Sequence, residues 1–116
     1  MQRVASLIHL NAARSLKLTG KGVGIAVFDT GIGRHPDLTM PGTRLQAFVD
    51  IVNHRKDYYD DNGHGTHITG IIAGSGQASQ RKYEGIAPDS HFIMIKVLNQ
   101  KGEGNARRYP LASRSL

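Results

Sequence analysis

The chain has 116 residues, of which 39% are apolar, and this length suits one domain or part of one. The apolar share is a little low for a self-sufficient core, so we expect a monomer of marginal stability. No cysteine is present, which excludes a disulfide scaffold and zinc sites built on thiolates.

The net charge of +6 raises the question of nucleic-acid binding. Half of this excess lies in residues 106–116, which hold three arginines and no acid. In residues 1–105 acidic and basic residues are interspersed, and no ladder of basic and aromatic side chains is present. We therefore expect no nucleic-acid partner.

No apolar run approaches the roughly 18 residues of a membrane span, and the start of the chain lacks the pattern of an export signal. We therefore expect no membrane partner. The sequence leaves the compartment open and favours the cytoplasm over secretion.

The first elements predicted are a helix and a strand. Residues 4–18 place apolar residues at helical spacing, and residues 19–22 end the pattern in a turn. The almost continuous apolar run at residues 23–28 predicts a strand buried on both faces of a parallel sheet. Asp29 follows at the carboxyl end of this strand, where catalytic groups collect in open α/β sheets.

Two further strands are expected. Residues 31–42 read as a loop, and alternation over residues 45–51 predicts the second strand. After a loop at residues 75–90, the apolar run at residues 92–98 predicts the third. We expect the three strands to be parallel neighbours, with residues 102–104 extended along a cleft.

Residues 64–73 place apolar residues on one helical face and predict the second helix. Asp61 or Asn62 is expected to cap its start, and Gly74 and Gly76 to end it. Two glycines inside it each cost about 1 kcal/mol relative to alanine. The cost indicates that another backbone approaches closely at both of them, Gly65 and Gly70.

Asp29 and His64 are the candidate catalytic pair. A histidine at the positive end of a helix dipole tends to stay neutral, as a general base must. A nearby buried carboxylate fixes its tautomer and stabilises the imidazolium as it forms. In the alternative interpretation, Asp29 caps a turn and His64 merely begins a helix.

Five segments together resemble the subtilisin-like serine proteases, the peptidase S8 family, and occur in the family's order. They are residues 25–32, 35–38, 63–73, 85–88 and 95–98. The resemblance is nearest to bacterial subtilases of the intracellular or AprX-like kind. It covers roughly residues 4–105.

The resemblance implies an α/β fold, an incomplete three-layer subtilisin-like domain with a parallel sheet flanked by helices. By position, Asp29 matches the family's catalytic aspartate and His64 its general base, while His67 matches a packing position. The stretch Gly102, Glu103 and Gly104 resembles the segment that pairs with an extended polypeptide substrate. The function implied is serine-type endopeptidase activity, which needs no cofactor for its chemistry.

A calcium ion is a further expectation from the family. Asp37 matches a calcium-ligand position in some subtilases, but residues 75–84 contain one carboxylate and two cations, a poor match to an oxygen-rich cage. A surface or capping role for Asp37 is favoured. Zinc bound by His64 and His67 with Asp29 or His35 is disfavoured, because no His-Glu-x-x-His pattern is present.

The departures from the family are equally specific. The block with the nucleophilic serine and the asparagine that donates to the oxyanion have no counterpart here. Ser113 and Ser115 lack the strained turn and following apolar helix of such a nucleophile. We expect residues 1–105 to be the N-terminal part of a catalytic domain, and residues 106–116 a divergent, disordered basic tail produced by truncation or a frameshift.

Two hypotheses follow. In the first, the chain carries the Asp and His of an Asp-His-Ser triad, is inactive alone and can be completed by a complementing C-terminal half. In the second, it is an inactive fragment or pseudoprotease that binds peptides through an exposed sheet edge.

Overall fold

A computed structural model describes residues 8–40, 42–80 and 84–104, in which three parallel strands form one sheet. Strand β1 is Gly24–Asp29, β2 is Leu45–Asp50 and β3 is His91–Lys96, in the spatial order β1-β3-β2. The prediction of three parallel neighbours is confirmed. Strand β3 ends earlier than predicted, because the N–H groups of Val97 and Leu98 both donate to the Asp29 carbonyl.

The longest helix among the described residues, α4 (His64–Ala73), begins and ends where the sequence predicts, with Gly74 as its C-cap. Helix α2 (Leu10–Ser15) is shorter than the predicted 4–18, of which residues 4–7 lie outside the described residues. It ends before the predicted turn because Lys17 adopts a left-handed φ of 59° and the Leu18 N–H returns to the Ala13 carbonyl.

One short helix lies inside the predicted loop 31–42. Helix α3 (Pro36–Thr39) starts with proline at its first position, and the His35 Nδ1 accepts a hydrogen bond from the Asp37 N–H. A 3₁₀ turn, η1 (Gln77–Ser79), follows α4. The predicted loop at 31–42 is wrong at these four residues, because histidine serves there as an uncommon N-cap.

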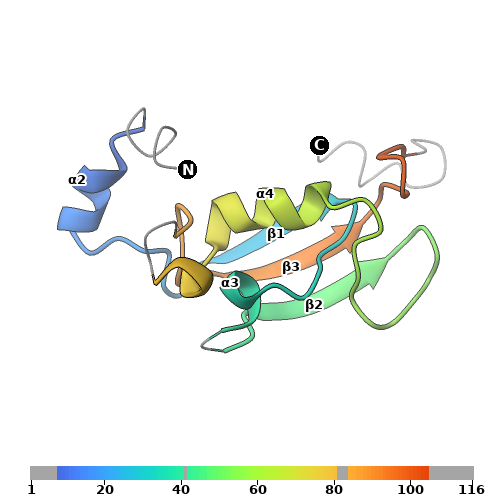
Figure 1. Cartoon of the computed structure of the whole chain (residues 1–116), viewed down its shortest axis with the longest axis horizontal. Helices are drawn as coiled ribbons and strands as arrows, with labels where there is room; N and C mark the ends of the chain where they lie inside the picture. Colours follow the sequence, from blue (N-terminus) through green and yellow to red (C-terminus); the bar gives the residue numbers. More distant parts are fainter. Residues whose placement is uncertain (1–7, 41, 81–83, 105–116) are drawn as a thin grey trace.

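Helices α3 and α4 lie over the same face of the sheet (Figure 1). The core forms between them and the side chains that this face presents. Its buried members come from β1 and the loop after it, from β3 and from both helices, and Leu45 and Phe48 of β2 pack against them while only partly buried. The buried members are Val27, Ile32, Leu38, Ala73, Phe92 and Met94.

The side chains that point to the opposite face remain partly open to solvent. Successive side chains of a strand alternate between faces, so Ala26 and Phe28 of β1 lie opposite Val27. Ala26 is exposed, Phe28 is half-buried, and Val49 of β2 is 49% exposed. Ile93 and Ile95 in β3 are also only half-buried.

The prediction that β1 is buried on both faces is therefore wrong for this chain. The expected α/β fold with a parallel sheet and helices is present, and the described residues form two layers of the incomplete three-layer domain, the sheet and the helices of one side. The apolar run at residues 23–28 is suited to burial on both faces of the sheet, but within the described residues no element packs on the second face.

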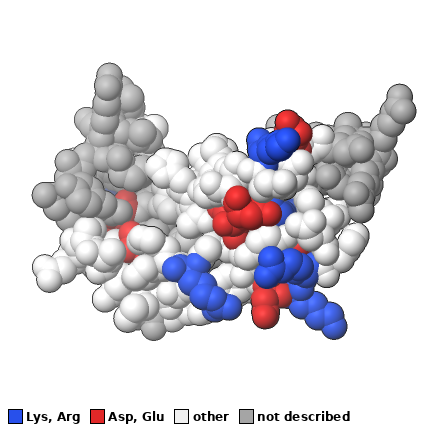
Figure 2. Space-filling view, turned by 45° about the vertical axis from the view of Figure 1, so that its right-hand side comes forward, with Lys and Arg blue, Asp and Glu red and all other residues white. Residues whose placement is uncertain are grey.

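Acidic and basic side chains lie side by side on one face of the molecule. Figure 2 shows a group of acidic side chains at the centre of this face, with basic ones beside it. Within the described part of the chain, no helix has the length and apolar character needed to cross a membrane.

Candidate active site

Asp29 is the last residue of β1, and its carboxylate lies buried at the carboxyl edge of the sheet. The residue is 7% exposed. Its Oδ1 accepts a hydrogen bond of 2.6 Å from the Thr30 N–H. Parallel strands bring Asp29 and Lys96 opposite each other at this edge, which is where functional side chains collect in open α/β sheets.

His64 is the first residue of α4, and its ring contacts the Asp29 carboxylate. The His64 Nδ1 lies 2.9 Å from both Oδ1 and Oδ2 of Asp29. A neutral imidazole that donates from Nδ1 to this carboxylate keeps Nε2 as an acceptor. The His64 side chain is 59% exposed, so Nε2 can receive a proton from a reacting group. The expected contact between these two residues is present.

Gly65 explains how the helix comes so near to β1. A Cβ at this position would lie 2.2 Å from the Gly31 carbonyl oxygen, so only glycine permits the approach. The Gly65 N–H donates a 2.8 Å hydrogen bond to Thr30 Oγ1. The predicted close approach is thus confirmed at Gly65. At Gly70 a Cβ would meet nothing within 4 Å, so no close contact requires glycine there.

The turn before α4 is organised by a residue that the sequence interpretation missed, Asp60. Gly63 is the N-cap and has a φ of 104°, so neither predicted capping residue occupies that position. Asn62 Oδ1 does accept a 3.0 Å hydrogen bond from the His64 N–H, whereas Asp61 pairs with Lys96 instead. An aspartate followed by Asn and Gly two and three residues later is a turn signal that could have identified Asp60.

The Asp60 carboxylate is acidic for a clear physical reason. Burial acts to raise its pKa, but hydrogen bonds from Thr66, Gly63 and Thr30 outweigh burial and lower the pKa to about 2. Asp60 is therefore ionised under all ordinary conditions.

Lys96 lies in a segment that carries the family resemblance, but the sequence interpretation missed the role of its side chain. It is 0% exposed, and its Nζ donates to the Thr30 carbonyl at 2.5 Å, the Leu98 carbonyl at 2.7 Å and Asp61 Oδ1 at 2.8 Å. A buried ammonium needs such partners, because an unpaired charge is very costly in the interior. A lysine inside the apolar run 92–98 was the available signal.

The segment expected to receive substrate adopts a turn. Asn99 Oδ1 accepts hydrogen bonds from the N–H groups of Lys101 and Glu103, and the Asn99 N–H donates to the Glu103 carbonyl. Gly102 has a φ of 76°. The predicted extended conformation is wrong at Gly102, because these Asn99 hydrogen bonds close the chain locally. The substrate-binding role of Gly102, Glu103 and Gly104 stays a prediction.

Asp37 serves as an anchor for the loop after α4. Its Oδ1 accepts a 2.8 Å hydrogen bond from the Ala78 N–H, which fits the capping role. Between residues 8 and 104, wherever the structure is described, no group of three or more His, Asp or Glu could hold a metal ion. The hydrogen bond from Ala78 occupies one of the two carboxylate oxygens of Asp37, and calcium binding there stays a prediction.

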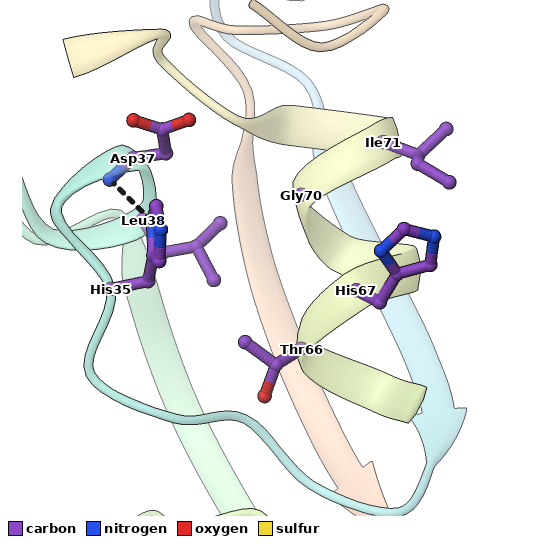
Figure 3. Close-up of a pocket in the computed structure, with 7 residues that line it drawn as sticks. All are labelled: His35, Asp37, Leu38, Thr66, His67, Gly70 and Ile71. Carbon is purple, nitrogen blue, oxygen red and sulfur yellow. Dashed lines mark hydrogen bonds between the residues drawn. The ribbon is translucent and has the colours of Figure 1, made fainter. Parts of the chain in front are cut away.

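A pocket of about 260 Å³ lies between α3 and α4. Figure 3 shows Thr66 and Gly70 on the α4 side and Leu38 on the α3 side. Neither Asp29 nor His64 lines it, so it is separate from the candidate catalytic pair. The lining residues are His35, Asp37, Leu38, Thr66, His67, Gly70 and Ile71.

Comparison with known proteins identifies the family of this fold. The sequence profile of the subtilase family, peptidase S8, matches residues 20–109. Serine protease AprX of Bacillus subtilis is 53% identical over 87 residues, which cover 75% of this chain and 19% of that protein. Minor extracellular protease Epr of the same species is 40% identical over 100 residues, covering 84% of this chain and 14% of that protein.

A solved structure agrees with these sequence matches. The crystal structure of a cold adapted subtilisin-like serine proteinase matches with a TM-score of 0.64 at 33% identity, over 78% of this chain and 30% of that one. The chain thus spans less than a third of the length of each of these relatives. Because the family profile runs through most of the chain and the fold agrees with that of a subtilisin-like proteinase, the chain belongs to the subtilase family.

Proposed function

We propose that this chain supplies two of the three catalytic groups of a serine endopeptidase and is inactive by itself. Asp29 orients the imidazole, His64 is the general base, and the nucleophilic serine comes from another segment. Ser113 and Ser115 lie outside the described residues, and neither is proposed as the nucleophile.

The observation that carries the proposal is the contact between His64 Nδ1 and the Asp29 carboxylate at 2.9 Å. It puts the proton on Nδ1 and leaves Nε2 free to act. In the complete enzyme Nε2 takes the proton from the serine hydroxyl while that oxygen attacks the peptide carbonyl. The imidazolium then gives the proton to the leaving amine as the C–N bond breaks, and Asp29 stays ionised throughout.

A polypeptide is the proposed substrate, and its backbone is proposed to lie along Gly102, Glu103 and Gly104. Main-chain hydrogen bonds of this kind tolerate many side chains. The chemistry uses side chains alone, so we propose no cofactor for it.

The proposed partner is the remaining part of a subtilase catalytic domain. Support comes from the share of AprX that the chain spans, 19%, and from the apolar sheet face that the described helices leave open. Burying that face against helices of the partner would complete the second layer.

Complementation tests the function. The full chain is mixed with the downstream part of a related subtilase, containing the serine and the oxyanion asparagine, and peptide hydrolysis is measured. We expect activity from the mixture and none from either part alone. A fluorophosphonate probe should label the mixture only on the supplied serine.

Substitutions then test the catalytic roles. In the mixture, His64→Ala should lower kcat roughly 10⁴-fold or more, and Asp29→Asn roughly 10⁴-fold through the wrong tautomer. His67→Ala is the matched control, because it removes an imidazole from the same helix without touching Asp29. An active mixture that is indifferent to His64→Ala would show that the assignment is wrong.

A second candidate function is peptide binding without hydrolysis. The observation that favours it is the sheet order, in which β1 and β2 are the outer strands and each has one unpaired edge among the described elements. Such edges can accept an added strand. Peptide binding by the mixture without turnover would favour this candidate.

A further inference from the structure

Asp60 lies between β2 and α4 and takes no part in the proposed proton transfers, yet both of its carboxylate oxygens are fully engaged. Oδ1 accepts hydrogen bonds from Thr30 Oγ1 at 2.8 Å, the Gly63 N–H at 2.8 Å and the Asn62 N–H at 3.1 Å. Oδ2 accepts from the Thr66 N–H at 2.9 Å and from Thr66 Oγ1 at 2.5 Å.

The two threonine hydroxyls extend this network in a fixed direction. Thr30 Oγ1 accepts a 2.8 Å hydrogen bond from the Gly65 N–H, and Thr66 Oγ1 accepts one of 2.8 Å from the Gly33 N–H. A hydroxyl has one proton to donate, and each directs it to Asp60. The network therefore needs an ionised carboxylate at its centre, in agreement with the lowered pKa of Asp60.

The contacts of Asp60 flank both members of the candidate catalytic pair. Thr30 directly follows Asp29, and Gly63 directly precedes His64. Asp60 also forms an isolated antiparallel bridge with Gly31. One side chain thus sets the position of one backbone segment relative to the other.

The His64 ring depends on that placement. Among the described residues, Asp29 is the one side chain that hydrogen-bonds it, and more than half of the His64 side chain is exposed. Because no second side chain in the described part of the chain hydrogen-bonds the ring, the positions of the two backbone segments decide whether Nδ1 reaches the carboxylate.

We propose that Asp60 is a positioning residue, which holds the segment after β1 against the start of α4 and thereby keeps the His64 ring on Asp29. A role in capping α4 alone would not account for the bond to Thr30, because Thr30 belongs to the other segment. Asp60 touches no reacting atom in this proposal.

The test is the tautomer of His64 in the full chain, read from the ¹⁵N chemical shifts of its ring at alkaline pH, where an imidazole is neutral. The parent should show the Nδ1–H form. Asp60→Asn puts an amide group in place of one oxygen, so it cannot accept all five donors and should shift His64 toward the Nε2–H form of an unconstrained histidine. Asp57→Asn, an exposed acid of the same loop, is the matched control and should leave the tautomer unchanged.

A second pair of variants keeps the test decisive. Thr30→Val removes the hydroxyl that joins Asp60 to Gly65 and should shift the tautomer, whereas Thr30→Ser keeps the hydroxyl and should restore the parent form. The amide signals of Gly70 and Ala73 report whether α4 remains folded. A folded Asp60→Asn or Thr30→Val chain that retains the Nδ1–H form overturns the proposal. So does unfolding of both variants, because Asp60 would then be a general stability residue.

Kinetics of the complemented enzyme give a further readout that rests on the proposed function. Asp60→Asn should lower kcat by about 10²-fold, the effect of a misplaced catalytic group, with KM nearly unchanged. A KM that rises by the same factor by which kcat falls would contradict a positioning role. The tautomer measurement needs no turnover, so failure of the peptidase proposal and failure of this one are distinguishable.

Discussion

Single buried charges hold the candidate site together at the residue scale. Lys96 donates to two backbone carbonyls and to Asp61, and it stands opposite Asp29 in the sheet. It therefore joins the segment after β1, the turn before α4 and the segment after β3. The first of these segments adjoins Asp29, the second adjoins His64, and the third leads to Gly102, Glu103 and Gly104.

Lys96→Met should destabilise the chain by about 1–3 kcal/mol, because methionine fills the space but leaves buried carbonyl oxygens without donors. Urea unfolding measures the change. Lys101→Met is the control, since Lys101 is exposed. Equal midpoints for the two variants would show that the Lys96 contacts contribute nothing.

Asp60 predicts a pH dependence with a definite sign. Its pKa is lowered from 3.8 to about 2 on folding. Its hydrogen bonds therefore stabilise the fold fully above pH 3.8, and this stabilisation is lost as the pH falls toward 2. The Asp60→Asn chain should therefore be less stable than the parent at neutral pH. It should also lose less stability than the parent as the pH falls from 3.8 to about 2.

Urea midpoints at neutral pH and at steps between those pKa values measure this. Asp50 contributes to the same acid loss, because hydrogen bonds from Asn53 and Tyr59 lower its pKa against the opposing effect of burial. Subtracting the pH profile of the Asp60→Asn chain from that of the parent removes the contribution of Asp50, which both chains share. Parallel profiles for parent and Asp60→Asn would refute the assignment to Asp60.

At the scale of elements, the contact between α4 and the loop after β1 is made possible by one glycine. Gly65 lies against the Gly31 carbonyl, whereas Gly70 has open space where a side chain would begin. The same residue type in the same helix thus has two different roles.

Gly65→Ala should destabilise the chain by roughly 1–3 kcal/mol, because its Cβ must push the helix away from Gly31. Gly70→Ala should stabilise it by about 1 kcal/mol through helix propensity. Thermal unfolding of the two variants measures both signs. A Gly65→Ala chain as stable as the parent would mean that the close approach is dispensable.

For the whole molecule, the open sheet face sets the behaviour. The helices cover one side, and Ala26, Phe28 and Val49 point to the other. Exposed apolar surface of this kind favours association.

Val49→Ser should weaken binding of the chain to the complementing subtilase segment by about tenfold, because less apolar surface is buried. Titration calorimetry measures the change in Kd. Leu16→Ser is the control, since Leu16 is 72% exposed at the end of α2, away from the sheet. Equal weakening by both variants would place the docking surface elsewhere.

The sequence by itself determined the three strands, the bounds of α4 and the contact of Asp29 with His64. Strand and helix periods are local patterns, so they can be read from neighbouring residues. The subtilisin-like resemblance then fixed which two residues meet, since family order carries information about contacts far apart in the chain.

Tertiary structure alone decided the roles of Asp60 and Lys96, the turn at Gly102 and the open face of the sheet. Asp60 reaches Thr30 across 30 positions, and Lys96 reaches it across 66. Hydrogen bonds between such distant segments leave no periodic trace in the sequence. Burial is likewise a property of what lies on each face, so an apolar run suited to two covered faces could not reveal that one of them is open here.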